Sequence, residues 1–182
     1  MMARALAAMS PVACATATVA FAGTAAERPV GAIANCALQS SADFPRAFSS
    51  LDNLVVGPLV LVGGGRLTSA ETVNAYGGNK FPLLVAAGHR VTVEVPRGTR
   101  RFASLAYVAV PSHRPLAVGD GDRVVTFRSC ERRKASSDAS GRPVTFWSGF
   151  VLAGRPQCLA FRVWVDTEAK PRRVKLPLGR RC

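Results

Sequence analysis

Short apolar runs separated by turn residues dominate the chain after residue 50. In residues 89–95 (HRVTVEV) valine occupies every second position, and in residues 158–166 (CLAFRVWVD) leucine, phenylalanine and valine do the same. A period of two is typical of a strand that turns one face to a core, because successive side chains of a strand point to opposite faces. Both runs are therefore predicted to be strands with one buried face.

Six further apolar runs lie before, between and after these two. They span residues 53–64, 81–86, 101–110, 123–129, 143–153 and 172–178. The linkers, such as PRGT, GDGD and AGRPQ, carry the glycine, proline and aspartate of tight turns. Only the stretch around residues 68–75 predicts a short turn of helix. The pattern predicts an all-β fold, an antiparallel β-sandwich of about eight strands, with a barrel as the second choice.

One stretch, VTFWSGFVLAG at residues 144–154, is free of charge. A membrane-spanning helix needs about 20 apolar residues, and this stretch is shorter and contains Ser148 and Gly149. We therefore expect a core strand, with Phe146 and Trp147 on opposite faces and Gly149 at a bulge or at a close approach of another backbone. A ligand platform is the alternative.

The first 26 residues differ from the rest. One early basic residue, an alanine-rich apolar stretch and a small-residue exit at residues 23–26 predict a secretory signal peptide that is cleaved near Ala25 or Ala26. The remaining length fits one domain. We expect an N-terminal extension at residues 27–50, a single sandwich domain at residues 51–182, and a secreted or cell-surface location.

Four cysteines follow the predicted leader: Cys36, Cys130, Cys158 and Cys182. Their even number, without CxxC or Cys/His spacing, favours disulfide bonds over a metal or redox site. Three pairings are possible. A hairpin of the last two predicted strands would place Cys158 near Cys182 and leave Cys36 with Cys130, so this pairing is predicted.

The net charge of the chain is strongly positive, which bears on the partners it could bind. It has a formal net charge of +13, and 20 of its 24 basic residues are arginine. A hydrophobic share of 48% and a charged share of 19% indicate a folded rather than a disordered chain. Such a charge attracts anionic partners, and arginine grips phosphate or carboxylate with two parallel hydrogen bonds. The alternative is that arginines fill solvated loops and keep the protein soluble.

The order of the strands predicts where this charge lies. If successive strands from residue 81 onward alternate in direction, the linkers at residues 96–100, 129–142 and 167–171 all fall at one end. The opposite end is expected to be nearly neutral. The anion-binding residues expected at the basic end are Arg97, Arg100, Arg101, Arg132, Arg133, Lys134, Arg172 and Arg173.

Signals for catalysis or metal binding are few. The two histidines, His89 and His113, lie beside turns, and no familiar nucleophile or zinc motif includes them. A triad of Ser148, one histidine and Asp120 stays open, because such triads are defined in space. The GDGD turn at residues 119–122 offers two carboxylates, too few for calcium. No catalytic residue, cofactor or metal is predicted.

Three segments carry a resemblance to known proteins. GRPVTFWSGFVLAGRPQCLAFRVWVD at residues 141–166, PRRVKLPLG at residues 171–179 and NKFPLLVAAGHRVTVEVP at residues 79–96 resemble small secreted β-rich proteins of high-GC actinobacteria, a group with no known activity. The resemblance covers about residues 50–182. It implies export and a β-rich fold, and it implies no functional residue.

The sequence leaves two functions open. The favoured one is a secreted, non-enzymatic binding or structural module whose basic loops contact anionic cell-envelope or extracellular polymers. The alternative is a small secreted hydrolase with an unrecognised site. Nucleic acid is not an expected partner, because the aromatic residues sit inside strands and export separates the chain from most nucleic acid. No transmembrane helix is expected in the mature chain.

Overall fold

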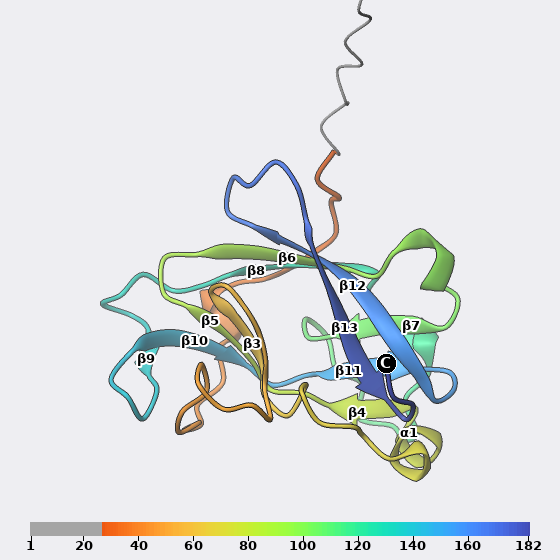
Figure 1. Cartoon of the computed structure of the whole chain (residues 1–182). Helices are drawn as coiled ribbons and strands as arrows, with labels where there is room; N and C mark the ends of the chain where they lie inside the picture. The colour runs from red at the N-terminus through yellow and green to blue at the C-terminus, as the bar shows by residue number, and fades with distance from the viewer. Residues whose placement is uncertain (1–26) are drawn as a thin grey trace, which may run out of the picture.

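The computed structural model describes residues 27–182, so the predicted signal peptide at residues 1–26 lies outside the described residues. Within that range thirteen strands form three sheets, and none of the three closes into a barrel. The strand pairs are antiparallel except for one parallel pair at an edge. Figure 1 shows the sheets as stacked layers. The predicted all-β, sandwich-like fold is confirmed, and the barrel alternative is wrong.

The first sheet has the strand order β1, β8, β6, β12, β13. Its strands are β1 (Ala32–Ala34), β8 (Val124–Arg128), β6 (Arg90–Glu94), β12 (Gln157–Val165) and β13 (Arg172–Leu178). Val91 and Val93 of β6 and Phe161 of β12 are buried in the core, so the period-two pattern identified the inner face correctly. Residues 27–50, expected as an extension, supply β1 to this sheet.

The remaining strands form two further sheets. The second contains β2 (Leu54–Val56), β3 (Leu59–Leu61), β5 (Leu83–Ala86), β10 (Pro143–Trp147) and β9 (Ser136–Ser137), and the third contains β4 (Gly78–Lys80), β11 (Phe150–Ala153) and β7 (Ala103–Ala106). The strands outnumber the predicted eight partly because two long apolar runs divide. Residues 53–64 turn back at Gly57, whose φ of 60° favours glycine, and residues 143–153 break at Ser148 and Gly149.

Gly149 lets the chain pass from the second sheet to the third. A Cβ atom at this position would lie 2.2 Å from Cδ1 of Tyr107 and 2.6 Å from the carbonyl oxygen of Ala106. The predicted close approach of another backbone is therefore confirmed. Trp147, two residues earlier, is fully buried. The stretch at residues 144–154 belongs to the core and is not a ligand platform.

Three aromatic rings join the three sheets in the core. Trp147 comes from β10, Phe127 comes from β8, and Tyr107 directly follows β7. The ring centroid of Phe127 lies 5.3 Å from that of Tyr107 and 5.3 Å from that of Trp147, and both pairs are edge to face. The Tyr107 hydroxyl donates to the carbonyl oxygen of Phe81 at 2.7 Å. One continuous apolar cluster thus connects the sheets.

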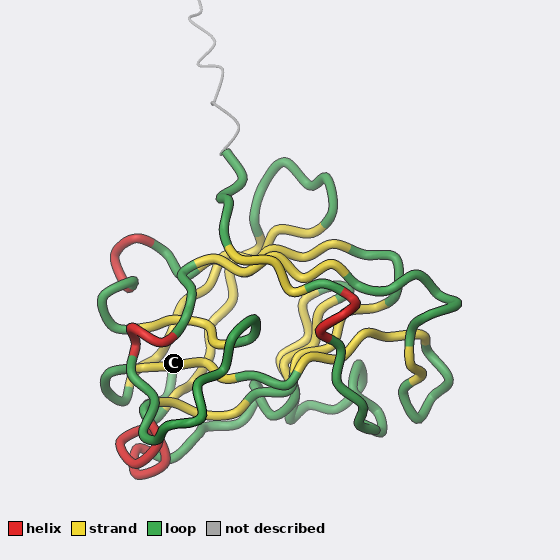
Figure 2. Tube along the Cα trace, turned by 180° about the vertical axis from the view of Figure 1, so that it is seen from behind, coloured by secondary structure: helices red, strands yellow, loops and turns green. Residues whose placement is uncertain are grey.

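The helical segments are short and lie at the periphery of the strands, as Figure 2 shows. Helix α1 (Ala70–Tyr76) begins after Ser69, whose hydroxyl accepts a hydrogen bond from the Thr72 N–H, and ends at the left-handed Gly77. The short helix predicted near residues 68–75 is confirmed. In residues 27–182 no helix is long and apolar enough to cross a membrane. The 3₁₀ turns are η1 (Cys36–Leu38), η2 (Arg97–Thr99) and η3 (Val118–Asp120).

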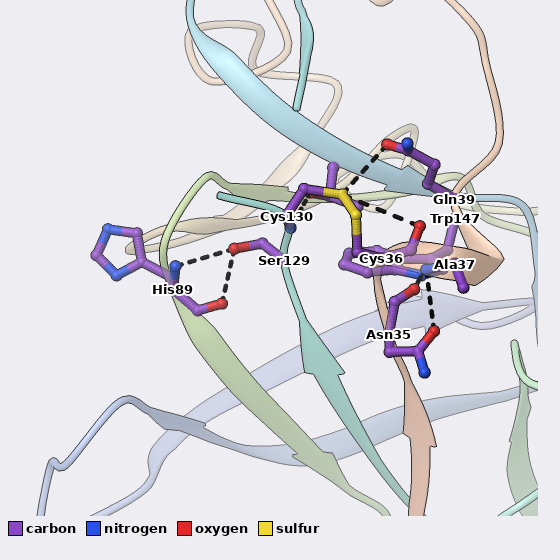
Figure 3. The surroundings of a disulfide bond; sticks show 9 residues. Asn35, Cys36, Ala37, Gln39, His89, Ser129, Cys130 and Trp147 are labelled. Atoms are coloured by element: carbon purple, nitrogen blue, oxygen red, sulfur yellow. Dashed lines mark hydrogen bonds between the residues drawn. A yellow bond between two sulfur atoms is a disulfide. The ribbon is translucent and has the colours of Figure 1, made fainter. Parts of the chain in front are cut away.

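Two disulfide bonds link the described chain, Cys36–Cys130 and Cys158–Cys182. The predicted pairing is confirmed, because β12 and β13 form the expected antiparallel hairpin. The Cys36–Cys130 bond joins η1, which follows β1, to the chain just after β8 (Figure 3). It therefore fastens the N-terminal part of the described chain to the first sheet.

The single basic end predicted from the strand order is wrong. β6 and β8 are antiparallel neighbours, so Arg90 at the start of β6 lies opposite Arg128 at the end of β8. The linker at residues 96–100 therefore leaves the sheet at the opposite end from the linker at residues 129–142. Only the latter and the turn at residues 167–171 share an end, because β12 is antiparallel to β6.

Candidate functional site

The outer face of the first sheet carries a dense group of basic side chains. On β6, β8 and β12 the odd-numbered residues pack in the core, so the even-numbered residues point outward. On β13 the outward residues are the odd-numbered ones. The basic residues at these outward positions are Arg90, Arg128, Arg162, Arg173 and Lys175.

Four of these arginines form two like-charged pairs across neighbouring strands. Arg90 lies opposite Arg128, and Arg162 lies opposite Arg173. Like charges at directly opposite positions destabilise a sheet, by an amount on the order of 0.2–1 kcal/mol per pair. Only Arg162 of these four arginines forms an ion pair in the described chain, so the other three carry positive charge that no carboxylate of the fold compensates by an ion pair.

Two segments border this face and leave an open hollow of about 630 Å³ between them. One is the N-terminal segment, orange in Figure 1, which reaches the layer formed by β6, β8 and β12. The other is η2 with the residue after it. We use the name arginine hollow for the group formed by Arg28, Arg97, Arg100, Arg162, Glu94 and Trp164.

Glu94 holds two guanidinium groups of the hollow in place. Its side chain is 7% exposed, and its carboxylate oxygens lie 3.3 Å from Nη2 of Arg100 and 3.8 Å from Nη1 of Arg162. Nε of Arg100 also donates to the carbonyl oxygen of Val95 at 3.0 Å. A carboxylate this deeply buried is tolerated because it is paired. Arg97, in contrast, is exposed and has no ion-pair partner in the described chain.

The hollow and the outward strand residues form one surface, which we name the basic face. Its acidic side chains are Glu27, Glu94 and, at the edge, Glu131 and Asp166. Eight positive charges against these four give the face a net charge of +4 within residues 27–182, and a field of this sign attracts anions. Its basic side chains are Arg28, Arg90, Arg97, Arg100, Arg128, Arg162, Arg173 and Lys175.

The structure brings only part of the predicted anion-binding set together. Arg97, Arg100 and Arg173 lie on the basic face. Three others are exposed on the loop after β8, beyond the end of the sheet strands. These are Arg132, Arg133 and Lys134.

The last two predicted residues are engaged elsewhere. The guanidinium of Arg101 lies 4.5 Å from the ring centroid of Phe102, as in a cation–π contact. Arg172 donates from Nε to Glu168 at 3.1 Å and lies beside Gly57 in the turn between β2 and β3. Neither belongs to the basic face.

The predicted anion-binding set lacks five members of the face: Arg28, Arg90, Arg128, Arg162 and Lys175. For four of them a signal was present, since Arg90, Arg128, Arg162 and Lys175 occupy the outward positions of the alternation that identified the core. Arg28 lies in a segment without periodicity, so no sequence pattern places it.

Each histidine is hydrogen-bonded to an aspartate. Nδ1 of His89 lies 2.7 Å from Asp166, and Nε2 of His113 lies 2.9 Å from Asp120. Burial raises the pKa of Asp166, but hydrogen bonds from the Arg90 N–H and from His89 outweigh this effect, and the pKa lies below its usual value.

The described residues do not assemble the catalytic triad that the sequence left open. Ser129 Oγ donates to the main-chain carbonyl of His89 at 2.8 Å, and the imidazole points away from the disulfide in Figure 3. The N–H of Ser148 donates to Ser40 Oγ at 3.4 Å, and no hydrogen bond in residues 27–182 joins Ser148 to a histidine. The same residues contain no group of three or more His, Cys, Asp or Glu that could hold a metal ion.

No protein-family model, curated protein or solved structure matches the chain. The resemblance to secreted actinobacterial proteins therefore stays a prediction.

Proposed function

We propose that this protein is a secreted, non-enzymatic binding module that contacts anionic cell-envelope or extracellular polymers through its basic face. The observation that carries the proposal is that two pairs of arginines lie opposite each other in the strand register, Arg90 with Arg128 and Arg162 with Arg173. Like charges at opposite positions cost folding free energy, and only Arg162 of the four has an ion-pair partner in the described chain, so a bound anion would relieve the repulsion.

A polymer suits this face better than a single ion. The outward basic residues lie on four neighbouring strands, β8, β6, β12 and β13. Three strand spacings of about 4.8 Å spread these charges over about 15 Å. A chain of repeated negative charges meets several of them at once, and each contact adds to the affinity without a further loss of free movement.

Secretion is part of the proposal. The two disulfide bonds of the described chain support it, because disulfides persist in oxidising compartments and are rare in the cytosol. The signal peptide predicted at residues 1–26 supports it independently.

Retention on an immobilised polyanion tests the proposal. The wild-type chain is loaded on polyphosphate and on a sulfated polysaccharide, then eluted with increasing NaCl. A face variant with Arg90→Gln, Arg128→Gln, Arg173→Gln and Lys175→Gln should elute at clearly lower salt, because these charges no longer hold the polymer.

A matched variant separates the face from net charge. It removes the same number of charges elsewhere, through Arg101→Gln, Arg132→Gln, Arg133→Gln and Lys134→Gln, and it should elute close to the wild type. Equal losses in the two variants would show that net charge alone governs retention. Wild-type retention that survives about 1 M NaCl, where the Debye length is about 3 Å, would rule out the electrostatic mechanism.

The hydrolase alternative has two observations in its favour, the 2.7 Å contact between His89 and Asp166 and the 2.9 Å contact between His113 and Asp120. It requires turnover that is lost in a His89→Ala or a His113→Ala variant that still folds. Wild-type protein without activity on ester, glycoside and phosphate substrates would end this alternative.

A further inference from the structure

Within the basic face, we propose that the arginine hollow binds a tetrahedral oxyanion, a phosphate or sulfate group carried by the polymer. This inference rests on the proposed function and deepens it. The face attracts the polymer, and the hollow recognises one of its charged groups. Three features of the hollow indicate this ligand. Its arginines converge, two of its buried hydrogen-bond donors have no acceptor in residues 27–182, and the Arg28 side chain beside Trp164 is held only loosely.

The positive charge of the hollow comes from three separate parts of the chain. Arg28 belongs to the N-terminal segment, Arg97 and Arg100 belong to η2 and the residue after it, and Arg162 belongs to β12. Glu94 and Glu27 also line this hollow, so two of its four positive charges are uncompensated within the described residues. The donors therefore approach a common space from different directions.

Two buried donors of the hollow reach no acceptor in residues 27–182. Trp164 is 2% exposed and its indole Nε1–H is unpaired, and the same holds for Nη1 of Arg28, whose guanidinium lies 5.8 Å from the Trp164 ring centroid. The other tryptophan, Trp147, shows the usual solution: its Nε1–H donates to the carbonyl oxygen of Asn35 at 3.0 Å. The unprotonated oxygens of a phosphate or sulfate group accept hydrogen bonds and would satisfy donors of this kind.

Arg28 is held loosely enough to admit such a ligand. Its Nη2 donates to the carbonyl oxygen of Glu168 at 3.4 Å, which is long for a hydrogen bond, and it forms no ion pair in the described chain. Its distance from the Trp164 ring is close to the limit for a cation–π contact. A small shift of the Arg28 side chain therefore opens the hollow toward Trp164 without breaking a strong interaction.

The geometry favours a tetrahedral group over a carboxylate. Arg100 and Arg162 already direct one nitrogen each to Glu94, so neither can offer its whole guanidinium edge to a planar carboxylate from that side. Their remaining N–H groups and those of Arg97 come from separate elements. Phosphate and sulfate present oxygens in several directions and can accept from all of them, whereas a carboxylate has two coplanar oxygens.

The indole N–H signals of the two tryptophans test this inference directly. In a ¹H–¹⁵N correlation spectrum of the wild-type chain, inorganic phosphate or sulfate is titrated at an ionic strength held constant with NaCl. We expect the Trp164 Nε1–H signal to shift and saturate, while the Trp147 signal stays in place because its N–H is already bonded in the core. A Trp164→Phe variant assigns the signals. Acetate at the same concentrations should leave both signals unchanged.

Substitutions then identify the arginines that bind the oxyanion. Arg97→Gln, at an exposed position without an ion pair, should fold normally and weaken the phosphate affinity about tenfold, the loss typical of one charged hydrogen bond. Arg101→Gln, which removes a nearby charge outside the hollow, should leave the affinity unchanged. An Arg97→Gln titration identical to the wild type would overturn the inference, and so would an equal response to acetate.

The two proposals fail in different ways. If the face variant loses retention on polyanions but the Trp164 signal never responds to phosphate or sulfate, the proposed function stands and the oxyanion site is rejected. If the Trp164 signal saturates but the wild-type chain is not retained on any polyanion, the polymer function is rejected. The hollow is then a site for a free oxyanion, and the polymer-borne group proposed here is wrong.

Discussion

Glu94 shows how a single buried carboxylate organises the basic face. An isolated carboxylate that is 7% exposed would be strongly unfavourable, but its oxygens meet Arg100 and Arg162. The carboxylate thus fixes two guanidinium groups that would otherwise repel each other and move freely in solvent. The sequence pattern places Glu94 on a strand but does not predict its burial. The N-terminal segment and η2, which border it, have no periodic pattern.

The variant Glu94→Gln should therefore destabilise the protein. We expect the free energy of unfolding to fall by about 1–3 kcal/mol, since glutamine keeps the shape but loses the charge that pairs with two arginines. Urea denaturation at neutral pH measures this change. Glu131→Gln, on the exposed loop after β8, is the matched control and should change stability by less than about 0.5 kcal/mol. An unchanged stability of Glu94→Gln would contradict the organising role.

Asp166 makes stability depend on pH in a defined direction. Burial raises its pKa, but hydrogen bonds from the Arg90 N–H and from His89 hold the pKa below its usual value. A carboxyl group with a depressed folded-state pKa stabilises the fold above its unfolded-state pKa of about 3.9 and loses this contribution as the pH falls. Asp166→Asn should therefore be less stable than the wild type at about pH 7 and approach it at about pH 3.

Asp122 offers a control of opposite sign for this experiment. Burial raises the pKa of Asp122, so its carboxylate becomes a greater burden on the folded state as the pH rises. The stability of Asp122→Asn relative to the wild type should therefore increase with pH, measured by the same denaturation series. A difference between Asp166→Asn and the wild type that is constant with pH would refute the linkage.

At the scale of secondary-structure elements, the sequence patterns predicted the strands and their buried faces correctly, but not which strands are neighbours. The alternation in residues 89–95 and 158–166 gave both strands and their inner faces, and the hairpin of β12 and β13 gave Cys158–Cys182. Counting strand directions failed because β6 and β8 pair antiparallel, whereas β7, which lies between them in the chain, belongs to the third sheet. Which runs become neighbours depends on long-range packing, which no local pattern encodes.

The break between β10 and β11 gives an element-scale prediction. Gly149→Ala should lower the free energy of unfolding by about 1–3 kcal/mol, because the added Cβ meets Tyr107 and the backbone of Ala106 inside the core. Thermal or urea denaturation measures the loss. Gly119→Ala is the control: its Cβ would meet nothing within 4 Å, so it should be neutral or slightly stabilising. Equal effects of the two substitutions would mean that the sheets separate easily at this point.

At the scale of the whole molecule, the two disulfides of the described chain constrain very different lengths. Cys36–Cys130 joins residues 94 apart, and Cys158–Cys182 joins residues 24 apart. The longer bond ties the segment that carries Arg28 and β1 to the end of β8, so it also helps to hold one border of the basic face. The shorter bond fastens the end of the chain to β12.

Loop length should decide which bond matters more for stability. In the chain-entropy account, loops of these two lengths contribute about 4.7 and about 3.4 kcal/mol. The double variant Cys36→Ala/Cys130→Ala should therefore lose about 1 kcal/mol more than Cys158→Ala/Cys182→Ala, and the cavity left at Cys130, which is 1% exposed, adds to the difference. Urea denaturation of the wild type and both variants measures it. If the Cys158→Ala/Cys182→Ala chain is the less stable, local anchoring of β12 and the chain end outweighs the entropy of the long loop.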